Sequence, residues 1–186
     1  PKLGAECRLK EIAPQIQIEI AILRDQLPEA ELATGEIDLV LGFDEYMDVP
    51  RYLCRETWLQ EPLAGLVQQQ NDQVGEQLDL TKLIALPHVF HSPLGTRESM
   101  VDRYLTSHGL QRRISANSQS YLSAAAIVSQ TDHLLVLPKK VASMLTGNWP
   151  LRMVSLPDDM PCYHLNCVWH PAQGEHPSVI WLRQLM

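Results

Sequence analysis

Basic residues are scarce in this chain. Fifteen Lys and Arg stand against 22 Asp and Glu among 186 residues, so the formal net charge is -7. The only adjacent basic pairs are Arg112-Arg113 and Lys139-Lys140. A surface that binds nucleic acid needs clustered Lys and Arg to contact the phosphates. The composition therefore argues against direct DNA binding by this part of the protein.

Cysteines and long apolar runs are also few. The four cysteines, at positions 7, 54, 162 and 167, form no C-x-x-C pair, which is typical of reduced thiols in a cytosolic protein. No run approaches the roughly 18 apolar residues of a membrane-spanning helix, and the first residues contain no apolar signal core. We expect a cytoplasmic location and no membrane contact.

Motifs for catalysis and cofactor binding are absent from the sequence. There is no G-x-S-x-G, no G-x-G-x-x-G and no phosphate-binding loop. The histidine groupings with the spacing of a metal site are His88 with His91, and His170 with Glu175 and His176. In a strand, residues three apart point to opposite faces, and the second group lies in a loop of unconstrained geometry. We expect no metal, no cofactor and no enzymatic activity.

The hydrophobic pattern predicts strands that alternate with short helices. Predicted strands cover 16–22, 37–41, 52–58, 63–67, 88–91, 112–116, 134–137, 151–156 and 163–170, with 37–41 buried on both faces. Predicted helices end at Pro14 and cover 28–35, one turn after Asp79, 96–108, 118–130, 138–147 and 177–186. This alternation favours a doubly wound α/β fold with parallel sheets, in which ligands bind outside the carboxyl ends of the strands.

Small polar residues follow several of these predicted strands. Gly42 and Phe43 follow one strand, residues 91–96 lie between a strand and a helix, and residues 117–120 occupy a similar junction. The N-terminal end of a helix leaves backbone N–H groups free to bind a carboxylate. Simple capping of each helix is the alternative explanation. Two such junctions at one sheet edge favour a ligand site.

Three segments carry a resemblance to a known family. They are ELATGEIDLVLG at 31–42, SYLSAAAIVSQTDHLLVLPKKVA at 120–142, and CYHLNCVWHPAQGEHPSVIWLRQL at 162–185. With them the chain resembles the effector-binding domain of LysR-type transcriptional regulators, in the branch of nodulation regulators and leucine-operon regulators. The resemblance implies two Rossmann-like lobes with a ligand cleft, similar to type 2 periplasmic binding proteins. Lobe I would contain residues 1–61 and 158–186, and lobe II residues 62–157.

The resemblance also implies which residues line the cleft. From lobe I these would be Phe43 and Asp44. From lobe II they would be Ser92, Leu94, Gly95, Thr96, Asn117, Ser118, Gln119, Tyr121 and Pro138.

The implied function is sensing of a small organic effector, aromatic or carboxylate-bearing, that modulates binding of promoter DNA by an upstream winged-helix domain. Family members form homodimers and homotetramers, and the helix before Pro14, the 16–22 strand and the 96–108 helix are either contact surfaces or core. Members also carry a strand before the segment that matches Pro1, so we expect one in the intact protein. A periplasmic solute-binding protein and a small α/β enzyme with the same cleft are the alternatives.

Overall fold

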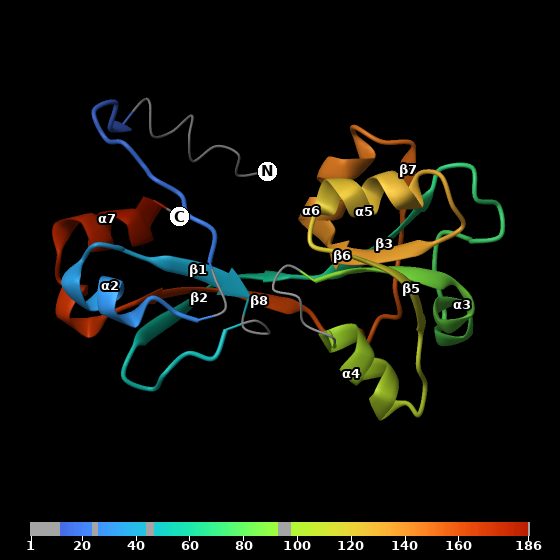
Figure 1. Ribbon diagram of the computed structural model, residues 1–186, viewed down its shortest axis with the longest axis horizontal. Helices are drawn as coiled ribbons and strands as arrows, with labels where there is room; N and C mark the ends of the chain where they lie inside the picture. The colour runs from blue at the N-terminus through green and yellow to red at the C-terminus, as the bar shows by residue number, and fades with distance from the viewer. Residues whose placement is uncertain (1–11, 24–25, 44–46, 93–97, 186) are drawn as a thin grey trace. The chain divides into compact units, whose positions relative to one another are not determined.

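The computed structural model describes residues 12–23, 26–43, 47–92 and 98–185. The chain folds as two compact units, unit 1 with Pro1–Leu59 and His164–Met186, and unit 2 with Gln60–Tyr163. Strands β2 (Cys54–Glu61) and β8 (Tyr163–Trp169) each cross from one unit into the other (Figure 1). The resemblance puts these divisions near residues 61 and 158.

Unit 1 is built on a three-stranded sheet of order β1-β8-β2. Strand β1 (Val40–Phe43) runs antiparallel to β8, with Val40 opposite Val168. Helix α2 (Glu29–Thr34) packs on Val168, while α7 (Pro177–Leu185) packs on the neighbouring Cys167, so the two helices cover opposite faces. Helix α2 ends at Gly35, whose φ of 78° lies in the left-handed region that favours glycine. A short 3-10 helix, η2, covers Pro171–Gln173.

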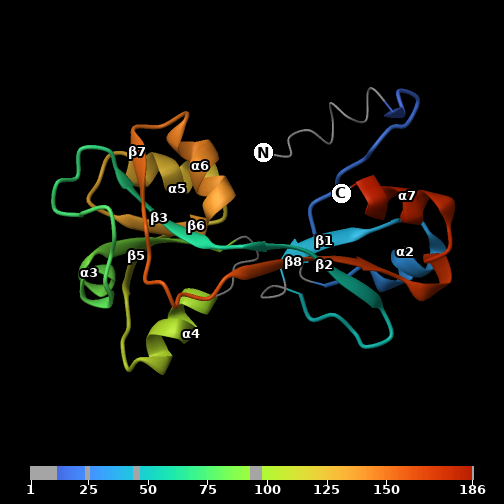
Figure 2. The ribbon, with the colours of Figure 1, turned by 180° about the vertical axis from the view of Figure 1, so that it is seen from behind.

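Unit 2 contains a five-stranded sheet of order β5-β4-β6-β3-β7. Its strands are β3 (Leu63–Gln68), β4 (Pro87–His91), β5 (Arg113–Ser118), β6 (Leu134–Pro138) and β7 (Leu151–Val154). The helices are α3 (Leu80–Ala85), α4 (Met100–Ser107), α5 (Tyr121–Val128) and α6 (Lys139–Thr146). Helices α5 and α6 cover one face of the sheet, and α3 and α4 cover the other (Figure 1 and Figure 2). The α/β fold class predicted from the sequence is confirmed.

The prediction of parallel sheets is correct for some strand pairs and wrong for others. Strand β4 is parallel to β5 and β6, but β3 is antiparallel to both β6 and β7. Because β3 comes directly from β2, it starts at the end of the sheet where β6 finishes, with Leu63 opposite Pro138. Strand β3 therefore runs antiparallel to β6.

Successive residues of β4 point to opposite faces of the sheet. Val89 packs with Ala124, Ala125 and Val128 of α5 in one hydrophobic cluster. His88 and Phe90 lie on the other face, where both contact Arg112. Because side chains alternate along a strand, His88 and His91 lie on opposite faces of the sheet and have different neighbours.

Two of the predicted strands differ in the structure. Residues 16–22 form no strand, and Ile16, Ile18, Ile20 and Ile22 expose 50, 41, 85 and 93% of their surface, because no described strand pairs with them. The strand predicted at 37–41 begins only at Val40 and lies at a sheet edge, so Leu41 is exposed rather than buried on both faces. The helix predicted before Pro14 lies almost entirely outside the described residues.

Adding a methyl group to Gly65 is expected to destabilise unit 2. A Cβ at Gly65 would lie 2.7 Å from Val154 Cγ2 and 2.9 Å from Leu134 Cδ1. Such crowding in a packed core costs about 1 to 3 kcal/mol. Urea denaturation should therefore show Gly65→Ala unfolding earlier than Gly75→Ala, since a Cβ at Gly75 meets nothing within 4 Å. Equal midpoints for the two variants would contradict this packing.

Candidate functional site

The parallel pairing of β4 and β5 brings several predicted site residues to one sheet edge. His91 lies opposite Ser118, and the Ser92 N–H donates to the Ser118 carbonyl at 3.1 Å. Helix α5 begins three residues after β5 ends, so Tyr121 joins the same edge. This edge is the carboxyl end of both strands, where ligands bind in open α/β sheets.

Serine hydroxyls shape the turn that leads into α5. Ser118 Oγ accepts from the Ser120 N–H at 3.1 Å and donates to the Ser120 carbonyl at 3.0 Å. Ser120 is the N-cap, and its hydroxyl accepts from the Ser123 N–H. The capping interpretation is thus confirmed for these serines. The first turn of α5 contains no acidic residue.

His91 lies under the start of α5 and is 8% exposed. Its ring stacks on the Tyr121 ring, with 3.8 Å between centroids and 30° between planes. Among the described residues, neither Nδ1 nor Nε2 has a hydrogen-bond partner. Burial lowers the pKa of His91 to about 4, and the neighbouring Ser118 backbone opposes this only in part. The ring is therefore neutral at pH 7.

His88 occupies the opposite face of β4, as the spacing of three predicts. Its Nε2–H donates to the Leu83 carbonyl at 2.8 Å, and its Nδ1 accepts from Arg112 Nη1 at 3.3 Å. Burial and the Arg112 charge lower the pKa of His88 to about 4. The two histidines do not converge on one point, and the described residues contain no cluster of three or more side chains fit for a metal ion.

Arg112 is the centre of a buried polar network that fixes the start of α4. The guanidinium bonds to both carboxylate oxygens of Asp102 at 2.7 and 2.8 Å, and to Ser99 Oγ at 3.0 Å. Ser99 and Asp102 form the capping box of α4. The network lowers the pKa of Asp102 despite its burial, since the Arg112 guanidinium and Ser99 stabilise the charged carboxylate.

Glu61 supplies a carboxylate to the start of α6. Glu61 is 4% exposed, and its Oε1 accepts from the Lys140 N–H at 2.7 Å while Oε2 lies 3.2 Å from Lys140 Nζ. Pro138, a predicted cleft residue, is buried at the end of β6 and is the N-cap of this helix. Sequence reasoning missed Glu61, because its partner lies 79 residues away and only the Glu-Pro step at the end of a strand marks it.

Of the remaining predicted residues, two lie at the edge formed by β4 and β5, one lies in unit 1, and the others lie outside the described part of the chain. Asn117 and Gln119 are exposed beside Ser118, and Phe43 ends β1 in unit 1. Asp44, Leu94, Gly95 and Thr96 lie outside the described residues. Hollows of about 240 and 660 Å³ border α4 and α3, and none of the predicted residues lines either.

A serine, a histidine and an aspartate meet in unit 1, but in the wrong order for a catalytic triad. Ser178 Oγ donates to Asp38 Oδ1 at 2.7 Å and lies 2.9 Å from His176 Nδ1. A nucleophilic serine gives its proton to a histidine that the aspartate orients, whereas here the serine stands between the other two. Among the described residues, no helix is long and apolar enough to cross a membrane.

Known proteins are similar to this chain in sequence. The family model described as LysR substrate binding domain matches residues 8–186. Nodulation protein D 3 of Mesorhizobium japonicum is 25% identical over 96% of this chain and 59% of its own length. Nodulation protein D 2 of a Bradyrhizobium species is 27% identical over 96% of this chain and 52% of its own length. The chain thus spans a little over half the length of these relatives.

Solved structures agree on the fold. The regulatory domain of MexT, a transcriptional activator in Pseudomonas aeruginosa, has a TM-score of 0.84 and 24% identity, covering 99% of this chain and 88% of that one. A probable transcriptional regulator from the same organism has a TM-score of 0.85 and 24% identity, covering 97% of this chain and 60% of that one. The family match over nearly the whole length confirms the resemblance seen in the sequence: the chain belongs to the LysR substrate-binding domain family.

Proposed function

We propose that this chain is the ligand-sensing part of a LysR-type bacterial transcription factor. It binds a small organic effector, and the bound effector modulates DNA binding by a winged-helix domain elsewhere in the protein. The observation that carries the proposal is the convergence of Ser92, Ser118 and Tyr121 at the carboxyl ends of β4 and β5. Family membership supports the same conclusion.

The proposed effector site is centred on unit 2. Ser92, Asn117, Ser118, Gln119 and Tyr121 supply hydroxyl, amide and aromatic groups at one edge of the sheet. Such a mixture suits an aromatic or carboxylate-bearing compound. Phe43, Asp44, Leu94, Gly95, Thr96 and Pro138 remain predictions of the sequence.

Signalling follows from differential affinity. An effector that binds one conformation better shifts the population toward it, and a coupling of about 1 to 3 kcal/mol suffices to change DNA affinity. We propose that the protein works in the cytoplasm as a homodimer or homotetramer and catalyses no reaction. The names of the relatives and structural neighbours, which include regulators, favour this over a periplasmic binding protein or an enzyme.

A thermal-shift screen tests the proposal. The chain is heated with aromatic acids, amino acids, phenols and inorganic anions, and calorimetry follows each hit. A ligand at a hundredfold excess over Kd adds about 2.7 kcal/mol of stability. We expect a saturable hit that Ser118→Ala weakens and that Ser143→Ala, on an exposed position of α6, leaves unchanged. Hits that both variants bind equally would contradict a site at this edge.

A further inference from the structure

Two segments of the chain cross from one compact unit into the other, and each contains a division between the units. The first division follows Leu59 in β2, and the second follows Tyr163, the first residue of β8. The side chains and carbonyls on either side of these divisions form hydrogen bonds within one unit or the other. These bonds indicate where each crossing becomes a fixed part of a unit.

The first crossing is fixed to unit 2 at Glu61 and Pro62. The Pro62 carbonyl accepts from the Lys139 N–H at 2.8 Å, and Glu61 Oε1 accepts from the Lys140 N–H at 2.7 Å. The end of β2 thus binds two of the backbone N–H groups that have no partner within α6. A hydrogen bond to a carboxylate is stronger than one between neutral groups. Glu61 is 4% exposed, so little water competes for it.

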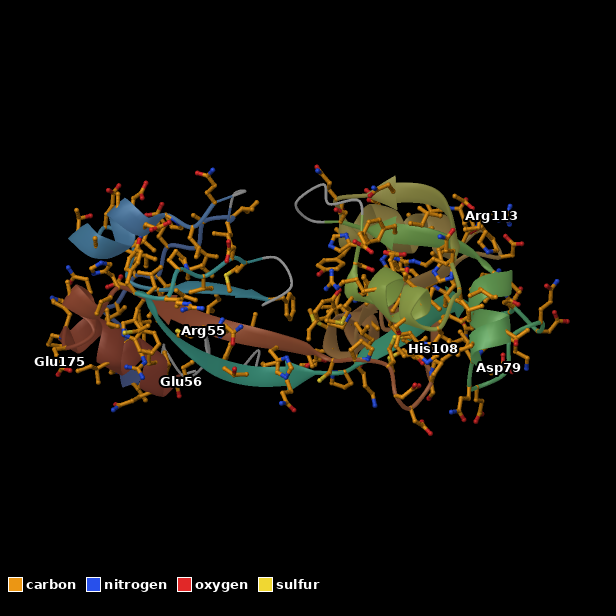
Figure 3. All side chains as sticks on the ribbon, turned by 90° about the horizontal axis from the view of Figure 1, so that it is seen from below. Arg55, Glu56, Asp79, His108, Arg113 and Glu175 are labelled. Atoms are coloured by element: carbon orange, nitrogen blue, oxygen red, sulfur yellow. The ribbon has the colours of Figure 1, made fainter. Side chains whose placement is uncertain are left out.

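The second crossing is fixed to unit 2 at Asp159. Its Oδ1 accepts from the Tyr104 hydroxyl at 2.6 Å, and its Oδ2 lies 3.7 Å from Nε2 of His108, at the end of α4 (Figure 3). Leu156 lies in the hydrophobic cluster that contains Tyr104, and Met160 packs against that cluster. The chain is therefore held on α4 as far as Met160.

On the other side of each division the strands are fixed to unit 1. Thr57 Oγ1 donates to Asn166 Oδ1 at 2.9 Å, which joins β2 to β8. Leu165 pairs with strand β1. The stretches between the contacts in unit 1 and those in unit 2 are residues 58–60 and 161–164. Both divisions between the units lie inside these stretches.

We propose that Glu61 and Asp159 anchor the two crossings to unit 2 and confine bending between the units to residues 58–60 and 161–164. The anchors bind α6 and α4, which cover opposite faces of the unit 2 sheet. A bend on the unit 2 side of either anchor would break a hydrogen bond to a carboxylate, whereas a bend within the two stretches breaks neither. Protein hinges are commonly a few residues at the ends of elements.

The anchors also connect the helices of unit 2 to the crossings. Because the Glu61 carboxylate holds the first turn of α6, a displacement of that turn moves the end of β2 with it. Asp159 does the same for the last turn of α4. The bending residues need no bound ligand, so this inference goes beyond the proposed function.

Relaxation-dispersion NMR of amide nitrogen-15 tests the position of the bending residues, because it detects the microsecond-to-millisecond motions typical of domain bending. In the chain without ligand we expect exchange broadening at the amides of 58–60 and 162–164. We expect none at Glu61, at Met160 or in the first turn of α6.

Removing the first anchor should extend the broadening into unit 2. In Glu61→Ala we expect it to reach Lys139 and Lys140, and we expect the Lys140 amide to exchange with solvent at least about tenfold faster. Glu56→Ala is the matched control, because Glu56 lies on the same strand but pairs with Arg183 in unit 1 (Figure 3). It should leave the amides of α6 as in the parent chain.

Removing the second anchor should have a different pattern. Tyr104→Phe keeps the ring in the core and removes only the hydroxyl that Asp159 accepts, so this test does not depend on whether Glu61→Ala folds. Broadening should extend to residues 158–160 and leave α6 unchanged. Asp158→Ala, at the neighbouring exposed position, should behave as the parent chain.

Three results would overturn the anchors. They are broadening in the parent chain at Met160 and in the first turn of α6, no broadening in either stretch, or the parent pattern retained in both Glu61→Ala and Tyr104→Phe. Since no ligand is present, each of these results leaves the sensing function untouched. A screen without any bound compound contradicts the sensing function and leaves the anchors in place.

Discussion

Replacing Arg112 with methionine is expected to lower the free energy of unfolding by about 3 to 5 kcal/mol, the usual cost of leaving one partner of a buried ion pair alone. The side chain of Arg112 is 2% exposed and that of Asp102 18% exposed. Without the guanidinium, Asp102 keeps its charge with only the Ser99 contacts, and His88 Nδ1 loses its donor. Urea denaturation at pH 7.5 measures the loss.

The neighbouring residue provides a matched control. Arg113 begins β5 and is exposed (Figure 3), so Arg113→Met should change the free energy of unfolding by less than about 0.5 kcal/mol. The double variant Arg112→Met with Asp102→Asn should cost less than the sum of the two single changes, since the uncompensated charge is gone. Similar costs for Arg112→Met and Arg113→Met would show that the network does not hold α4.

Acid is expected to remove about 6 kcal/mol of stability between pH 6.5 and pH 4. The pKa values of His88 and His91 are lowered from 6.5 to about 4 in the folded chain, mainly by burial, and the two residues are 0% and 8% exposed. In this pH window the unfolded chain binds more protons than the folded chain, so the free energy of unfolding rises with pH. Each pKa unit is worth about 1.36 kcal/mol, which gives about 3 kcal/mol for each histidine.

Urea denaturation at half-unit steps from pH 4.5 to 7.5 measures this slope. His91→Gln should remove about half of the histidine contribution, because the second buried ring remains. His91→Phe should lower the slope by the same amount as His91→Gln, because neither replacement carries a titratable group. A parent slope that persists in full in His91→Gln would mean that His91 does not resist protonation in the folded state.

Much of unit 2 follows from its sequence pattern. The buried run Leu134–Leu137 and the N-cap Ser120 are local signals, and the structure contains both β6 and α5 where they indicate. The period of two in a strand also predicts that His88 and His91 lie on opposite faces of β4, and they do. Local signals succeed here because each depends on residues within one turn or one strand.

Features that depend on distant residues could not be predicted in this way. The alternating isoleucines at 16–22 have the pattern of a strand, but a strand needs a neighbour and no described segment pairs with them. The antiparallel direction of β3 depends on where the chain enters unit 2. Packing between distant segments produces both the Glu61 contact with α6 and the surroundings of the His91 ring. No spacing of residues in the sequence predicts either feature.

Chemical-shift mapping of the amides by NMR tests the central claim most directly. The chain is labelled with nitrogen-15 and titrated with the compound that gives the largest thermal shift. We predict that the saturable shifts concentrate on Ser92 and on residues 117–122, at the ends of β4 and β5 and the start of α5. Shifts confined to other parts of the chain, such as the hollow along α4 lined by Glu98 and Gln111, or no saturable shift with any compound of the screen, would contradict a sensing site at this edge of the sheet.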